Sequence, residues 1–145
     1  MNYDNPDDVL KAMQPILDDC AKKDNGIDGI AFLLGPSVRA RSKVSGYGGE
    51  FNSEIAPQLF ETFDETTKEK LNFGTATSLQ FVSFMNKHEG SGEMEMWTLV
   101  TVFSSYKLVF TGKFKKEIRL FTHLSTVPLY IDKLLPLIEA YNKVV

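Results

Sequence analysis

The sequence predicts a mixed α/β (α+β) domain of three layers, with a largely antiparallel sheet of five to six strands between helices. Three observations lead to this prediction: the order of helical and strand-like segments, the short connections between the later strands, and strands that are apolar on both faces. The chain of 145 residues suits one domain, and its eleven phenylalanines supply a core. We therefore expect residues 1–145 to form a single domain, with the terminal helices on one face of the sheet and the middle helix on the other.

The first helix is predicted from its capping residues. Asn5 can cap the helix, Pro6 fits the first helical position, and Asp7 and Asp8 meet the positive end of the helix dipole. Apolar residues then recur at helical spacing on one face: Val9, Leu10, Met13, Ile16, Leu17 and Cys20. Pro15 inside this helix should remove a backbone hydrogen bond and bend the axis, unless the helix begins near it.

Two strands and a second helix should follow. Residues 27–34 form a short apolar run that is typical of a strand buried on both faces. In residues 38–44, small or apolar residues alternate with the cations Arg39, Arg41 and Lys43. This pattern favours an edge strand whose charges discourage pairing with other chains, and it favours that interpretation over a binding role. The second helix is expected through about Lys70. Its inner side should carry Ile55, Leu59, Phe60 and Phe63.

The remaining chain predicts a meander and a closing helix. Four strand-length segments are separated by few residues: Leu79 to Met85, Met94 to Phe103, Tyr106 to Thr111 and Glu117 to Leu124. The closing helix should begin at Ser125 or Thr126, because Pro128 then falls near its first turn. Pro136 should kink it.

The sequence shows no catalytic or metal-binding signature. His88 lies near Glu89 and Glu93, but their spacing matches no metal motif and favours a solvated loop. Cys20 falls on the apolar face of the first helix, where an inert buried thiol is common. We expect a protein that is not an enzyme and holds no cofactor or metal.

Charge and hydropathy limit the partners and the location. A net charge of −3 argues against general nucleic-acid binding, which depends on a basic balance. The N-terminus has no basic and apolar leader, and no apolar run approaches the roughly 20 residues that cross a bilayer. We expect a cytoplasmic protein.

The stretch "GIDGIAFLLGPSVRARS" after an amphipathic helix, together with the order of elements, resembles the profilin and roadblock folds. The long meander and apolar closing helix are more similar to profilin. That resemblance implies a cytoskeletal, monomeric protein that binds actin monomers through the late strands, the middle helix and the start of the last helix. The alternative resemblance, to roadblock/LC7 proteins, implies a homodimeric scaffold or regulator for small GTPases that dimerises through the middle helix and an edge strand.

The stretch Lys107 to Phe121 is basic within an acidic chain. It carries a charge of +4 and leaves −7 for the other residues, which suits steering toward actin, another acidic protein surface or anionic phospholipid headgroups. Phe114 between lysines is a candidate exposed anchor, although an edge hairpin with Phe114 turned inward is a close alternative. The profilin resemblance implies this actin-binding set: Trp97, Lys107, Lys113, Phe114, Lys115, Lys116, Arg119 and His123.

The same resemblance implies a polyproline site between the terminal helices. Tyr3, Tyr130 and Tyr141 lie in or near these helices, but the single Trp lies in a predicted strand. This departure from the profilin pattern argues against binding of proline-rich peptides.

Overall fold

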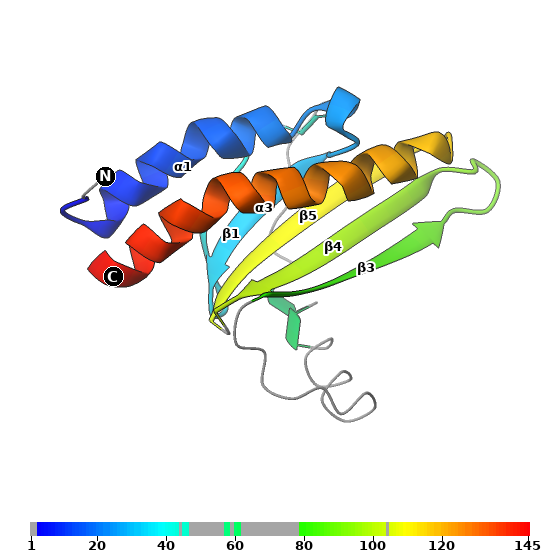
Figure 1. Cartoon of the computed structure of the whole chain (residues 1–145). Helices are drawn as coiled ribbons and strands as arrows, with labels where there is room; N and C mark the ends of the chain where they lie inside the picture. The colour runs from blue at the N-terminus through cyan, green and yellow to red at the C-terminus, as the bar shows by residue number, and fades with distance from the viewer. Residues whose placement is uncertain (1–2, 44, 47–56, 59, 62–78, 104) are drawn as a thin grey trace.

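The computed structural model describes residues 3–43, 45–46, 57–58, 60–61, 79–103 and 105–145 (Figure 1). The chain begins with helix α1 (Pro6–Cys20) and a short 3₁₀ turn, η1 (Lys23–Asn25), which lead into strands β1 (Gly29–Leu34) and β2 (Ser37–Arg41). A meander of β3 (Leu79–Lys87), β4 (Met94–Val102) and β5 (Tyr106–Phe114) follows, and α3 (Ile118–Val144) ends it.

The described strands form one antiparallel sheet in the order β2-β1-β5-β4-β3. The meander places β4 between β3 and β5, and β1 pairs with β5 from Gly29 opposite Thr111 to Leu34 opposite Tyr106. The first two strands thus join the meander through β5, which leaves β2 and β3 as the two edges of the described sheet. This architecture confirms the predicted fold class.

Each face of the sheet carries its own apolar cluster. Helices α1 and α3 cover one face side by side, and their buried residues pack with Ile30, Phe32 and Phe110 of the strands (Figure 1). On the opposite face, Phe60 is buried with the smaller cluster of Ala31, Leu33, Leu99 and Val109.

The segment that contains Phe60 is therefore the cover of the second face. Residues 57–58 and 60–61 are helical, which agrees with the predicted third layer. The other residues expected on the inner side of the middle helix, Ile55, Leu59 and Phe63, lie outside the described residues.

Helix α1 begins where the sequence predicts. The side chain of Asn5 accepts a hydrogen bond of 3.0 Å from the backbone N–H of Asp8, and Pro6 occupies the first turn. Pro15 lies inside the helix and on its exposed side, and it does not break the helix. A proline inside a helix costs one backbone hydrogen bond, which the packing of Val9, Met13 and Leu17 offsets here.

The predicted strand Glu117 to Leu124 is wrong, because these residues form the beginning of α3. Leu120 packs beside a small buried cluster under the helix, and His123 and Val127 are buried at helical spacing. The helix thus begins well before Ser125. Pro128 lies in its interior rather than in its first turn, and Pro136 does not break it. No helix in the described ranges has the length and apolar character to cross a membrane.

Candidate interaction site

The end of β5 and the start of α3 enclose a pocket of about 650 Å³, which we call the basic pocket. Its lining gathers five cations, one carboxylate and one aromatic ring: Lys23, Lys113, Lys115, Lys116, Arg119, Glu93 and Phe114. The cations come from η1, from β5, from the segment after β5 and from the first turn of α3, so residues far apart in sequence meet there. The side chains of the pocket have a formal net charge of +4 in a chain whose total is −3.

The cations of the basic pocket are exposed. Within the described part of the chain, no ion pair joins Lys113, Lys115, Lys116 or Arg119 to a carboxylate. Their charges therefore add to one local positive potential.

Phe114 is buried, so the expectation of an exposed aromatic anchor is wrong. Its side chain is only 3% exposed and packs with Met94 and Met96 of β4. Its ring also meets the ring of His123 edge to face, with 5.9 Å between the centroids. Phe114 thus fixes the end of β5 inside the fold and holds the flanking lysines at the surface.

His123 is also buried, and it lies on a helix rather than on a strand. Its Nδ1 lies 3.0 Å from the carbonyl oxygen of Gly26, and its Nε2 lies 2.8 Å from the hydroxyl of Thr98. Because a carbonyl only accepts, Nδ1–H donates to Gly26 and Nε2 accepts from Thr98. The hydroxyl of Ser83, 2.7 Å from that of Thr98, then donates to it.

This chain of hydrogen bonds joins β3, β4, α3 and the loop before β1. Gly112 leaves the space for it, because a Cβ there would lie 2.8 Å from Nδ1 of His123 and 2.7 Å from the carbonyl oxygen of Gly26. Burial lowers the pKa of His123 below its ordinary value of 6.5, against the opposing effect of the hydrogen bond to Gly26. His123 is therefore a neutral structural residue.

The predicted actin-binding residues fall on two faces of the sheet. Trp97 and Lys107 belong to the face that Phe60 covers, since Trp97 packs beside the cluster of Phe60 and the Lys107 ammonium lies 5.4 Å from the centroid of the Phe60 ring. Lys113, Lys115, Lys116 and Arg119 share the basic pocket. The structure thus brings four of the eight together as exposed cations and places Phe114 beneath them.

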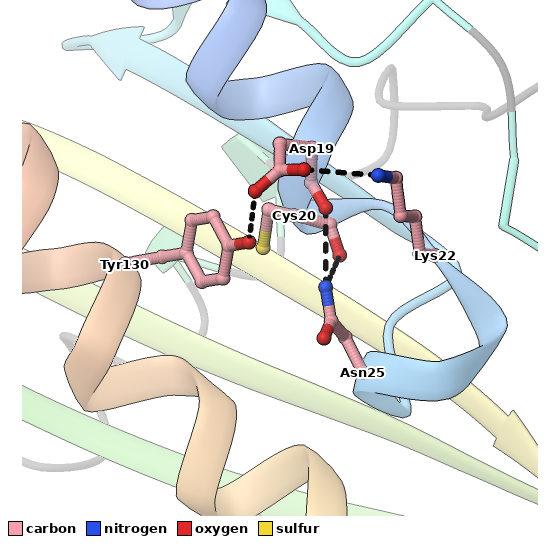
Figure 2. A network of polar contacts seen from close by, with 5 residues as sticks. All are labelled: Asp19, Cys20, Lys22, Asn25 and Tyr130. Atoms are coloured by element: carbon pink, nitrogen blue, oxygen red, sulfur yellow. Dashed lines mark hydrogen bonds and ion pairs between the residues drawn. The ribbon is translucent and has the colours of Figure 1, made fainter.

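The tyrosines considered for polyproline binding pack against the core. Tyr141 is 1% exposed and meets the rings of Phe32 and Tyr106 edge to face, and Tyr3 packs against the same core cluster. The hydroxyl of Tyr130 donates a hydrogen bond to the carboxylate of Asp19 on α1 (Figure 2). These rings join the terminal helices to each other and to the sheet.

Figure 2 shows how the end of α1 is fastened to α3. The side-chain amide of Asn25 donates to the carbonyl oxygens of Asp19 and Cys20, each at 3.1 Å, and the Lys22 ammonium lies 2.9 Å from Asp19. The hydrogen bond from Tyr130 lowers the pKa of Asp19, whereas burial, together with that carboxylate, raises the pKa of Tyr130. Burial raises the pKa of Cys20, so its sulfur stays a thiol and a poor nucleophile.

His88 shows no metal site with its acidic neighbours. Its Nε2 lies 3.4 Å from a carboxylate oxygen of Glu95, a partner that the sequence does not predict. Among the described residues, no group of three potential metal ligands comes together.

The two edges of the described sheet differ in their geometry. β3 pairs with β4 through nine consecutive residue pairs, from Leu79 opposite Val102 to Lys87 opposite Met94. β2 is shorter, and its pairing with β1 is irregular between Phe32 and Leu33. Sequence reasoning missed the β3 edge strand and Lys23 as functional candidates and weighed Glu93 only as a metal ligand beside His88, because strand pairing and the pocket depend on residues distant in sequence.

Comparisons with known proteins identify the fold. No family model matches this chain, and no curated protein matches it. Among solved structures, it is similar to Myxococcus xanthus MglB, with a TM-score of 0.57 and 13% sequence identity, over 97% of this chain and 95% of that chain. The chain has a roadblock/LC7-like fold. This likeness supports the alternative resemblance over profilin and shows the fold alone, because the sequence identity is low.

Proposed function

We propose that this protein is a homodimeric scaffold or regulator of the roadblock/LC7 type that binds a small GTPase. The observation that carries this proposal is the structural likeness to MglB over nearly the whole of both chains. A protein partner agrees with this fold, whereas actin binding gains no support from the comparisons.

The β3 edge is the surface that we assign to dimerisation. An edge strand offers unpaired backbone N–H and C=O groups to a strand of another chain. In a twofold dimer, β3 would pair with β3 of a second copy and extend the sheet across the interface. The exposed Met85, with 45% of its surface accessible, would then find cover. Roadblock resemblance implies dimerisation through an edge strand and the middle helix, which agrees with this assignment.

We also propose that the protein acts by binding and not by catalysis. Histidine and cysteine side chains often take part in catalysis. His123 and Cys20 are both buried, and burial keeps both side chains neutral. A scaffold needs only complementary surfaces, which the β3 edge and the basic pocket provide.

The dimer is tested by the mass in solution. Light scattering should give about twice the 16.3 kDa of one chain. Met85→Glu should weaken dimerisation by roughly tenfold or more, because a charge on an edge strand discourages strand addition. Arg39→Glu on β2 is the matched control and should leave the mass unchanged. A monomeric wild-type protein would contradict the proposal.

Binding to a GTPase is tested separately. Small GTPases encoded in the same genome, each loaded with GDP or with a non-hydrolysable GTP analogue, are titrated against the immobilised protein. We expect one of them to bind with an affinity that depends on its nucleotide. If the protein is dimeric and none binds in either state, the GTPase part of the proposal is wrong.

A further inference from the structure

The basic pocket has features that neither dimerisation through β3 nor the core requires. Five cations surround one concavity in a chain that is acidic overall, and the residues outside the stretch Lys107 to Phe121 sum to −7. Exposed lysines usually spread apart, since like charges that lie close together repel one another. Among the described residues, no ion pair joins Lys113, Lys115, Lys116 or Arg119 to a carboxylate, so these four cations suit a ligand with several negative charges.

The volume of the pocket indicates the size of the anion that it can hold. At about 650 Å³, it falls within the range of about 300–1,000 Å³ that is typical of sites for small organic ligands. The Arg119 guanidinium can bind a phosphate group through two hydrogen bonds, while the lysine ammoniums act as point charges around it.

Exposed apolar side chains lie next to these cations. Ile118 and Phe121, in the first turns of α3, are 67% and 64% exposed although both are large and apolar. Ile118 directly precedes Arg119, and Phe121 follows it two residues later, on a helix that begins one residue, Glu117, after Lys116. Basic residues beside protruding apolar side chains are typical of surfaces that bind the headgroup region of an anionic membrane.

The position of the pocket in the molecule permits such a contact. The end of β5, the start of α3 and the turn between β3 and β4 lie together at one end of the molecule, and both termini lie toward the other end (Figure 1). A membrane can thus approach this end of the molecule, where five cations outnumber the one carboxylate in the lining of the pocket.

We propose that the basic pocket binds the phosphorylated headgroup of an anionic membrane lipid, with Ile118 and Phe121 entering the membrane interface. An acidic peptide would also satisfy the cations. The membrane explains more, because Ile118 and Phe121 are exposed within the first turns of α3 and share a face of that helix, and a peptide held in the pocket leaves them without a role. This inference is independent of the GTPase proposal.

Vesicle co-sedimentation tests the proposal. The full chain is mixed with vesicles of phosphatidylcholine alone, or with added phosphatidylserine or phosphatidylinositol bisphosphate. We expect at least tenfold stronger binding to vesicles with phosphatidylinositol bisphosphate than to phosphatidylcholine alone, and a steep loss with added salt. Equal binding to all three vesicles, or binding to none, would overturn the proposal.

Two charge-reversal variants separate the pocket from overall charge. The variant Lys113→Glu, Lys115→Glu, Lys116→Glu should lose at least tenfold in affinity for anionic vesicles. The matched variant Lys11→Glu, Arg39→Glu, Lys143→Glu changes the net charge equally at exposed sites that do not line the pocket, and should keep most of the binding. Circular dichroism and thermal melting confirm that both variants fold. Equal losses in the two variants would contradict a specific site.

A third variant and two soluble probes distinguish the source of the phosphate. The variant Ile118→Ser, Phe121→Ser should weaken vesicle binding severalfold while leaving the affinity for free inositol trisphosphate unchanged. If the variant binds vesicles as the wild type does, no membrane insertion occurs and the proposal fails. Stronger binding to a polyglutamate peptide than to anionic vesicles would assign the pocket to a protein partner and also overturn it.

Discussion

The two edges of the sheet, β2 and β3, solve the problem of unpaired backbone groups in opposite ways. β2 is short, carries Arg39 on its exposed side and pairs irregularly with β1. α1 also fastens it, because the Gln14 side-chain amide donates a 2.7 Å hydrogen bond to the carbonyl of Arg41. Charge, a bulge and a covering helix are all known protections of an edge strand.

β3 has neither a bulge nor a covering helix among its described contacts, and its one charge, Lys87, stands at its end. Its pairing with β4 is regular over nine residues, and Met85 is exposed near its end. Its support comes from within the fold, through the hydrogen bonds from Ser83 to Thr98 and from Thr98 to His123. The comparison teaches that the fold closes one edge and keeps the other straight and anchored, as an edge that adds a strand must be.

The largest expected effect is on backbone exchange at the two edges. When the protein concentration is raised from below to above the dimerisation range, hydrogen exchange of amides in residues 79–87 should slow by roughly tenfold or more, because new strand pairing protects them. Amides of β2 should not change. Mass spectrometry of peptides from both strands measures this, and protection of β2 instead of β3 would reverse the comparison.

The inner support of β3 is tested by His123→Leu. This change leaves the carbonyl of Gly26 buried without its donor and removes a partner of Thr98, so it should lower the free energy of unfolding by about 2–3 kcal/mol. Urea denaturation measures the loss. His88→Leu is the control and should change stability by less than about 0.5 kcal/mol, because His88 is exposed. Similar losses in both variants would mean that the buried hydrogen bonds contribute little.

The same residue predicts a dependence on pH. The pKa of His123 is lowered in the folded protein, so just below pH 6.5 the unfolded chain binds a proton that the folded protein does not. Stability should therefore fall as the pH falls below 6.5, with a slope of at most about 1.4 kcal/mol per pH unit for this one group.

The control for this prediction is His123→Gln, which removes the titrating ring. The slope of the unfolding free energy between pH 6.5 and the folded pKa should become smaller in this variant. An unchanged slope in His123→Gln would show that other groups cause it.

The smallest effect is expected at the closed edge. Gln14→Ala removes the hydrogen bond to Arg41 and should lower stability by about 1 kcal/mol. Hydrogen exchange of the β2 amides should become faster, while that of the β3 amides should stay the same, because the lost hydrogen bond holds β2 and not β3. If the amides of both strands exchange faster together, the two edges open as one unit, which would contradict independent stabilisation of β2 and β3.

Local signals placed much of this fold correctly. Asn5, Pro6 and the acidic residues after them predict α1. The first backbone N–H groups of a helix have no acceptor within the helix, so a side chain that caps one of them and a proline that has no N–H both fit there. The apolar run before Gly35 and the short connections predict β1 and the meander. These features depend on neighbours along the chain, so the sequence alone reveals them.

The prediction failed where a polar residue depends on distant partners. Residues 117–124 are strand-length and closely follow the other segments of the meander, so the sequence predicts a strand, and no local pattern shows that His123 is buried on a helix. Its burial requires Thr98 and Gly26, which are remote in sequence. Phe114 was expected as an exposed anchor for a related reason, since only Met94 and Met96 of the neighbouring strand decide that it points inward.

The sequence by itself determined the order of elements, the amphipathic faces and the basic character of residues 107–121, because capping, periodicity and charge are local properties. Only the tertiary structure decided that four of these cations join Lys23 around one pocket and that β3 forms an open edge of the described sheet. Both depend on which strands pair and where α3 begins, and the packing of residues distant in sequence sets these.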